Sequence, residues 1–314
     1  MTDVVTLCMN PSIDLSTRVD RVKPIRKLRC EALKRDPGGG GINVARVVRR
    51  LGADVTAIYP VGGSTGQLLR RLVAEEGVAS LAFIGSEETR ADFTVSEKET
   101  GDQFRFVLPG PQLSEQEWRQ CFDAVISHMG PLLVASGSLP PGVPEDFYGR
   151  VARAAKQAGT RFIVDSSRAS LEAALTEGVY LIKPNLRELE ELARAPLENE
   201  QAWVEASRML VEEGRSELVA LTLGDQGALL VSKDRAWRAQ GTPVEAVSAV
   251  GAGDSFLGGL VWSLASRQCL EDAFRYGNAA GTAAVLAAGT ELCRKQDVER
   301  IYREVVVRKI WERF

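Results

Sequence analysis

A glycine turn followed by one carboxylate is the stretch of the sequence best suited to chemistry, Val250-Gly-Ala-Gly-Asp-Ser-Phe256. Gly251 and Gly253 allow a ligand to approach the main chain closely, and the apolar residues after Asp254 predict a buried helix that begins here. Backbone N–H groups at the start of a helix are unpaired and partly positive, so they suit a phosphate. Asp254 is then either a helix cap or a general base that takes the proton from a hydroxyl attacking phosphorus.

Two common phosphate-binding motifs are missing from the sequence. The dinucleotide fingerprint G-x-G-x-x-G would need glycine at position 256, where Phe256 stands, so an NAD-linked enzyme is disfavoured. No G-x-x-x-x-G-K-[ST] sequence occurs, which excludes a P-loop.

A second glycine run precedes another predicted helix. Four glycines, Gly38, Gly39, Gly40 and Gly41, would let a substrate lie against the backbone, and Asn43 in the first helical turn can bond to hydroxyls. A flexible loop is the alternative, but it would not need a helix to start at once.

Other polar residues are also candidates for binding a ligand, and for several of them a purely structural role is the alternative. Asp14 follows an apolar run and suits sugar hydroxyls, or is a loop aspartate. Asn185 and Glu188 form a helix-capping pair or hold the water shell of Mg²⁺. Ser138 lies at a strand tip, where open α/β sheets bind ligands. The guanidinium of Arg90 suits a phosphate, and Lys27 is a phosphate contact or a solvated charge.

The elements that must position these residues alternate between strands and helices along the whole chain. The alternation predicts a three-layer α/β/α fold with a mostly parallel central sheet. Segments of about 15–35 and 88–107 alternate polar and apolar residues, which predicts strands with one wet face in a small β lid. We treat residues 1–314 as one domain and expect a closing helix over 295–314.

The overall composition limits the kinds of binding partner and the cellular compartment that we expect for this protein. The formal net charge of −3 for 314 residues argues against nucleic acid held by charge. Five scattered cysteines show no metal spacing and predict reduced thiols in a cytoplasmic protein. No apolar stretch is long enough for a membrane span.

Four motifs in chain order resemble those of the ribokinase-like (PfkB) carbohydrate kinases. They are Asn10-Pro-Ser-Ile-Asp14, Pro37-Gly-Gly-Gly-Gly-Ile-Asn-Val-Ala-Arg46, Asn185-x-x-Glu188 and Val250-Gly-Ala-Gly-Asp-Ser-Phe256. Gly40 stands where the family usually has lysine, and Ser248-Ala249 where it has Asp-Thr. The second motif is most similar to the minor 6-phosphofructokinase branch.

The resemblance implies an ATP-dependent sugar-phosphate kinase, with fructose 6-phosphate as the expected substrate and ATP and Mg²⁺ as cofactors. Asp254 would be the base, beside an anion hole at Gly251, Ala252 and Gly253. Asp14, Gly38 to Gly41 and Asn43 would hold the sugar, and Arg90 and Ser138 its phosphate. Asn185 and Glu188 would serve Mg²⁺. The residues implied for nucleotide are Lys27, Lys183, Asn185, Thr222, Gly224, Gly227 and Thr282, and those for a monovalent cation such as K⁺ are Ser248, Val250, Ala287 and Gly289.

The resemblance also implies a homodimer formed through the lid. Three alternatives stay open: 1-phosphofructokinase, tagatose-6-phosphate kinase, and a sugar-phosphate-binding regulator without catalysis.

Overall fold

A large sheet forms the centre of the molecule. A computed structural model describes residues 3–287 and 289–312. Ten of their strands form one sheet in the order β14-β13-β12-β11-β10-β9-β8-β1-β4-β5. Their bounds are β1 Val4–Leu7, β4 Val55–Val61, β5 Ala79–Ile84, β8 Leu132–Ser136, β9 Arg161–Asp165, β10 Val179–Ile182, β11 Ser216–Thr222, β12 Gly227–Ser232, β13 Arg235–Gln240 and β14 Val307–Glu312.

The strands from β5 to β11 are parallel, and β12, β13 and β14 add an antiparallel edge. The parallel strands are almost wholly apolar because helices cover both of their faces. In β8, Leu132 and Val134 join one core, whereas Leu133 and Ala135 join the other.

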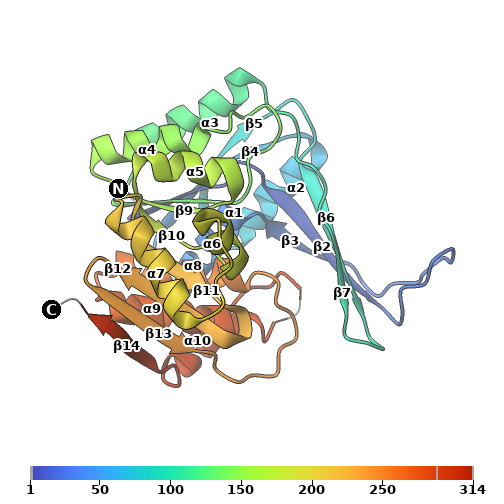
Figure 1. Cartoon of the computed structure of the whole chain (residues 1–314). Helices are drawn as coiled ribbons and strands as arrows, with labels where there is room; N and C mark the ends of the chain where they lie inside the picture. Colours follow the sequence, from blue (N-terminus) through green and yellow to red (C-terminus); the bar gives the residue numbers. More distant parts are fainter. Residues whose placement is uncertain (1–2, 288, 313–314) are drawn as a thin grey trace.

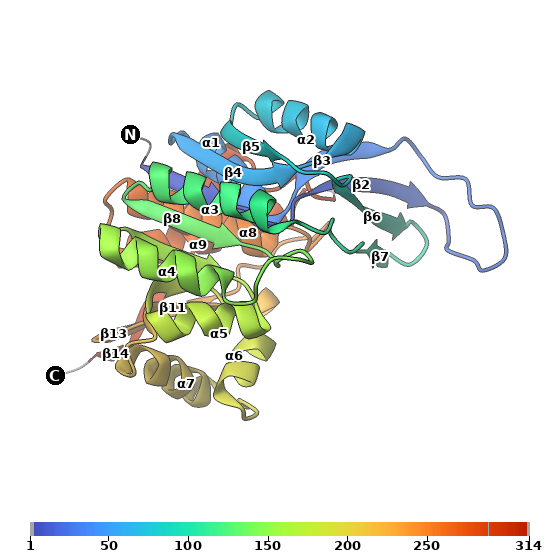
Figure 2. The same ribbon diagram turned by 90° about the horizontal axis from the view of Figure 1, so that it is seen from above.

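Helices form one layer on each face of this sheet (Figures 1 and 2). One core contains side chains of α1, α2, α8, α9 and α10, and the other contains side chains of α3, α4, α5, α6 and α7. The bounds are α1 Gly40–Leu51, α2 Gly63–Glu75, α3 Glu115–His128, α4 Phe147–Ala158, α5 Arg168–Glu177, α6 Leu186–Ala193, α7 Glu200–Glu212, α8 Ala252–Ala265, α9 Leu270–Ala284 and α10 Lys295–Tyr302. The predicted three-layer fold is confirmed.

A separate four-stranded sheet in the order β3-β2-β6-β7 projects from the body (Figure 1). We call this sheet the lid. Its strands are β2 Ser12–Val19, β3 Lys34–Gly38, β6 Arg90–Glu97 and β7 Gln103–Phe106. The pairs β2–β3 and β6–β7 are antiparallel, and β2–β6 is parallel.

Two expectations from the sequence are wrong in detail. Residues 20–33, expected within strands, form an exposed loop. This loop includes Pro24, which has no N–H for a sheet, and many charged residues. The end of the chain is not one helix, because α10 stops at Tyr302 and β14 then pairs with β13.

No helix within the described ranges is both long and apolar enough to cross a membrane.

Candidate functional site

The candidate site lies where the direction of strand order reverses. From β1 the chain first builds β4 and β5 on one side, and it later builds β8, β9 and β10 on the other. Connections therefore leave the carboxyl ends of β1 and β8 in opposite directions, and in open α/β sheets this is where a ligand-binding crevice is expected. The starts of α1 and α8 meet here, because these two helices pack against each other.

Asp254 lies in the first turn of α8, after Gly251, whose φ of 77° is left-handed. The helix has no side-chain cap hydrogen bond, so Asp254 does not act as the cap that the sequence left open. Its Oδ2 instead accepts a hydrogen bond of 2.8 Å from Nδ2 of Asn43, at the start of α1. The two glycine motifs thus meet at this carboxylate. Neither motif by itself predicted this contact.

The surroundings of Asp254 raise its pKa to about 6. Burial is the largest cause, and the negative charge of Asp165 adds to it, while the hydrogen bond from Asn43 and the charge of Lys183 oppose it. Asp14 makes a smaller unfavourable contribution. A carboxylate with a pKa close to neutrality is suited to accept a proton and release it again.

Lys183 provides the positive charge of the site. Its Nζ lies 3.2 Å from Oδ1 of Asp165 at the end of β9. Burial lowers the pKa of Lys183, but the charges of Asp165 and Asp254 raise it more, so the ammonium stays charged. A Cβ atom on Gly253 would lie 3.4 Å from this Nζ. Glycine there leaves a narrow gap between the helix start and the ammonium.

Asp165 and Ser136 are site residues that the sequence reasoning missed. Ser136 donates to Oδ2 of Asp165 at 3.2 Å, and both residues end neighbouring parallel strands. A polar residue closing an apolar strand was the available signal, and it was applied to Ser138 but not to these two.

The protein's own atoms occupy the space beside all four glycines at the start of α1. A Cβ atom on Gly39 would lie 2.6 Å from Sγ of Cys8. A Cβ atom on Gly38 would lie 2.1 Å from Oδ1 of Asp14, and one on Gly40 would lie 2.2 Å from Oγ of Ser136. A Cβ atom on Gly41 would meet a backbone carbonyl at 2.4 Å. Position 40, where the family usually has lysine, therefore requires glycine in this chain because Ser136 approaches it.

Asp14 faces the same crevice from the lid strand β2. Oγ of Ser12 donates to its carboxylate at 2.8 Å. Burial raises the pKa of Asp14, the hydrogen bond from Ser12 opposes the shift, and the charge of Asp92 adds to it.

Asn10 connects the two residues expected to hold a phosphate. Its Nδ2 donates to Oγ of Ser138 at 3.0 Å, and its carbonyl accepts from Nη2 of Arg90 at 3.0 Å. Nη1 of Arg90 bonds both carboxylate oxygens of Asp92, at 2.9 and 3.1 Å. Nε of Arg90 is buried without a hydrogen-bond partner within the described residues.

Asn185 and Glu188 form a complete capping box at the start of α6. Glu188 N donates to Oδ1 of Asn185 and Asn185 N donates to Oε2 of Glu188, both at 2.9 Å. The capping interpretation is confirmed. The cap uses only Oε2 of Glu188, so the other carboxylate oxygen is left for other partners. Burial raises the pKa of Glu188. Within the described ranges, no three or more His, Cys, Asp or Glu residues cluster as metal ligands.

The remaining predicted residues fall into three places. The amide of Thr222 donates to the Pro184 carbonyl at 2.9 Å, which sets the turn at Gly224 and Gly227 beside α6. The loop with Ser248 and Val250 lies against Val285, since the amides of Val247 and Ser248 both donate to its carbonyl. Oγ of Ser248 also reaches the carbonyl of Gly289 at 3.5 Å. Thr282 lies on α9, near Ala287 in sequence.

Lys27 is not brought to the crevice. It lies on the exposed loop 20–33, which extends from the lid away from the body (Figure 1).

Residues 2–297 match the pfkB family carbohydrate kinases, and the chain belongs to this family. It is 44% identical over 301 residues to ATP-dependent 6-phosphofructokinase isozyme 2 of Mycobacterium tuberculosis strain H37Rv, a match that covers 95% of this chain and 88% of the relative. It is 42% identical to the isozyme 2 of Escherichia coli K12, over 96% of this chain and 98% of the relative.

Solved structures are similar over nearly the whole chain. The Escherichia coli phosphofructokinase-2 in complex with fructose-6-phosphate superposes with a TM-score of 0.92 at 40% identity and covers 97% of this chain and 99% of the other. The same protein has been solved with potassium and in a tetrameric inhibited form. A 1-phosphofructokinase of Bacillus subtilis is 31% identical over 98% of this chain and all of that relative.

The raised pKa of Asp254 gives a prediction about stability. The carboxyl group has an ordinary pKa of 3.8 and a folded pKa of about 6, so the folded state binds the proton more tightly, and its stability falls as pH rises through this interval. Asp254→Asn should therefore raise the free energy of unfolding by about 1–3 kcal/mol at pH 8. The gain should shrink towards pH 4, as measured by urea unfolding.

Asp123→Asn, on the exposed face of α3, is the matched control and should show no such pH-dependent gain. A loss of stability at pH 8 in Asp254→Asn would contradict the prediction.

Proposed function

We propose that the protein transfers the γ-phosphoryl group of ATP to the C1 hydroxyl of fructose 6-phosphate. Its family makes it a carbohydrate kinase. The observation that carries the proposal is the meeting of Asp254, Asn43 and Lys183 at the start of α8, where a base, an amide donor and a positive charge surround one point.

In the proposed reaction, the C1 oxygen forms a bond to the γ-phosphorus while the bond from that phosphorus to the departing ADP oxygen breaks. The hydroxyl proton goes to Asp254. Amides of Ala252 and Gly253, in the first turn of α8, stabilise negative charge on the moving group, where a helix start is worth up to ~2 kcal/mol towards an anion. Alignment of the two substrates is the larger contribution, at about 7–11 kcal/mol.

The crevice residues would hold the sugar on the side opposite ATP. Asp14, Asn43 and the backbone of the glycine run would bind sugar hydroxyls. Ser138 and Arg90 would bind the sugar's own phosphate, since both are hydrogen-bonded to Asn10.

ATP would bind beside the turn at Thr222, Gly224 and Gly227, with the ammonium of Lys183 near its phosphates. Bound Mg²⁺ would neutralise phosphate charge, and Asn185 and Glu188 would hold it through its water shell. The carbonyls around Gly289 suit K⁺. Five unpaired cysteines, Cys8, Cys30, Cys121, Cys269 and Cys293, fit a reducing compartment such as the cytoplasm.

Wild-type protein should release ADP fastest with fructose 6-phosphate, when compared with fructose 1-phosphate and tagatose 6-phosphate in a coupled assay. Asp254→Asn should lower turnover by about 10²–10⁴-fold, because the attacking hydroxyl loses its base. ATP binding, measured by calorimetry, should change little.

Asp123→Asn should keep the wild-type rate. Preference for another sugar phosphate would correct the substrate, and binding without ADP release would favour a regulator. Near-normal turnover of Asp254→Asn would refute the role of the base.

The Mg²⁺ proposal can be separated from helix capping. Asn185 caps α6 and Asn199 caps α7 in the same way, each accepting a backbone N–H at 2.9 or 3.0 Å. Replacing either with alanine should lower the free energy of unfolding by about 1 kcal/mol. Only Asn185→Ala should also raise the Mg²⁺ concentration needed for half-maximal activity, measured by titration. An equal Mg²⁺ requirement in both variants would show that Asn185 acts only as a helix cap and has no role in Mg²⁺ binding.

The lid is proposed to pair with the lid of a second copy. Phe93 lies opposite Phe106 in the β6–β7 register, and Phe104 lies on the same face of β7. These three side chains are 42%, 54% and 37% exposed in the single chain, a patch that a second apolar sheet would cover.

Phe106→Glu should therefore shift the protein from dimer towards monomer in sedimentation velocity experiments. Met209→Glu, a similarly exposed apolar position on α7, should leave the dimer intact. A monomeric wild type, or a dimer unaffected by Phe106→Glu, would refute lid pairing.

A further inference from the structure

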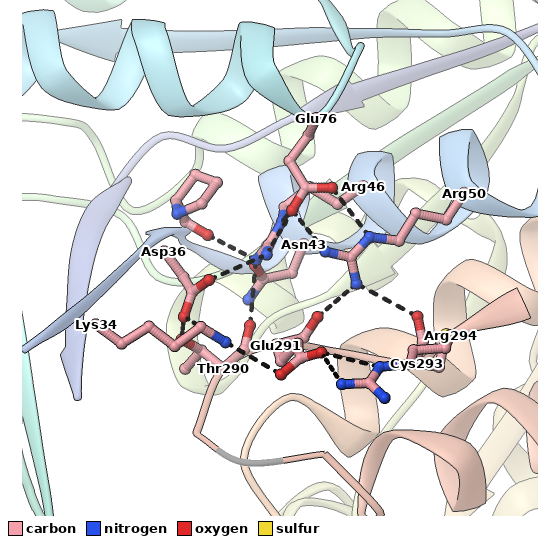
Figure 3. Close-up of polar contacts among 11 residues, drawn as sticks. Lys34, Asp36, Asn43, Arg46, Arg50, Glu76, Thr290, Glu291, Cys293 and Arg294 are labelled. Atoms are coloured by element: carbon pink, nitrogen blue, oxygen red, sulfur yellow. Dashed lines mark hydrogen bonds and ion pairs between the residues drawn. The ribbon is translucent and has the colours of Figure 1, made fainter. Parts of the chain in front are cut away.

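Arg46 is a fully buried arginine that no step of the proposed reaction uses. It lies on α1, and its guanidinium is surrounded by acceptors from four parts of the chain (Figure 3). Nε and Nη2 donate to Oε1 of Glu76 at 2.9 and 2.8 Å. Nη1 donates to the carbonyls of Pro37 and Thr290 at 2.9 and 3.3 Å, and to Oδ1 of Asn43 at 3.1 Å.

The last of these bonds reaches the candidate site. Asn43 and Arg46 are three residues apart on α1, so they share a face of the helix. A guanidinium carries only donors, so of the two ends of an amide it can donate only to the oxygen. With Oδ1 directed to Arg46, the nitrogen Nδ2 is left facing Asp254, where it donates at 2.8 Å.

We propose that Arg46 is a positioning residue that fixes the orientation of the Asn43 amide and so keeps a hydrogen-bond donor on Asp254. The inference rests on the proposed role of Asp254 as the base. Without Arg46, the amide could rotate by half a turn and present its oxygen to the carboxylate, which would favour the protonated acid.

The guanidinium is itself held in place by a charge network. Glu76, just after α2, also accepts from Arg50, with Nε at 2.9 Å and Nη2 at 2.5 Å. Burial raises the pKa of Glu76, but the hydrogen bond from Arg50 and the charge of Arg46 lower it more, so Glu76 stays ionised. Oγ1 of Thr290 donates to Asp36 at 3.1 Å, which ties the lid strand β3 to the same cluster.

The charged groups that face Asp254 come from three other elements: Asp165 at the end of β9, Lys183 after β10 and Asp14 on β2. Among all the groups around Asp254, the Asn43 amide and Lys183 favour the ionised form. Reversal of the amide removes one of these two, so the pKa of Asp254 should rise above about 6.

Arg50 is a matched control for Arg46. It lies one turn further along α1, shares Glu76, and donates to the carbonyls of Glu291 and Cys293. It makes no hydrogen bond to Asn43 among those the structure describes. The experiment compares Arg46→Lys and Arg46→Met with Arg50→Lys and Arg50→Met, after thermal unfolding by circular dichroism has established that each is folded. Glu76 keeps one arginine in every variant.

We expect both Arg46 variants to lower kcat by about 10- to 100-fold with little change in KM for ATP. The acidic limb of the kcat/KM profile should move to higher pH by about one unit. The Arg50 variants should keep the wild-type profile. In an Asn43→Ala background, Arg46→Met should have almost no further effect on kcat, because the two changes remove one interaction.

Equal profiles for Arg46 and Arg50 variants, or additive effects with Asn43→Ala, would overturn the inference while leaving the proposed function intact. Failure of both Arg46 variants to fold, with the Arg50 variants folded, would also count against it, since Arg46 would then serve stability. A wild type without sugar-phosphate kinase activity would instead remove the proposed function and this inference with it.

Discussion

The arrangement of this protein depends on keeping one titratable carboxylate, that of Asp254, buried among other negative charges. Asp254 lies near Asp165 and Asp14, and burial alone disfavours its ionised form. Two groups oppose that cost, the ammonium of Lys183 and the amide of Asn43. Their combined effect leaves the pKa near neutrality, where a carboxylate can serve as a base and still release its proton.

These groups come from separate helices and strands whose ends lie at the same edge of the sheet. Parallel strands bring their carboxyl ends to one edge of the sheet, so Asp165 at the end of β9 and Lys183 after β10 become neighbours. The starts of α1 and α8 deliver Asn43 and Asp254 to the same edge. Glycines at the start of α1 are required because other groups, such as the side chain of Ser136, occupy the space a Cβ would take.

Some residues satisfy a structural and a functional demand at once. The capping box of Asn185 and Glu188 stabilises α6 through one carboxylate oxygen of Glu188, and the other oxygen takes no part in the cap. Arg46 joins α1, the end of α2, the lid strand β3 and the loop at Thr290. A guanidinium with five donors is suited to such a junction, and each of its bonds limits movement of the elements around Asn43.

The sequence determined the features that depend on neighbouring residues. Apolar periodicity marked most strands and helices, glycine placed the starts of α1 and α8, and Asp254 was found from its motif. Only the tertiary structure decided the contacts across the chain. Asn43 and Asp254 are 211 residues apart, and Lys183 meets Asp165 only because β9 and β10 are adjacent. The loop 20–33 and the strand β14 were predicted wrongly for the same reason. Whether a segment forms a strand depends on the presence of a neighbouring strand to pair with, and the local sequence does not determine which strands become neighbours.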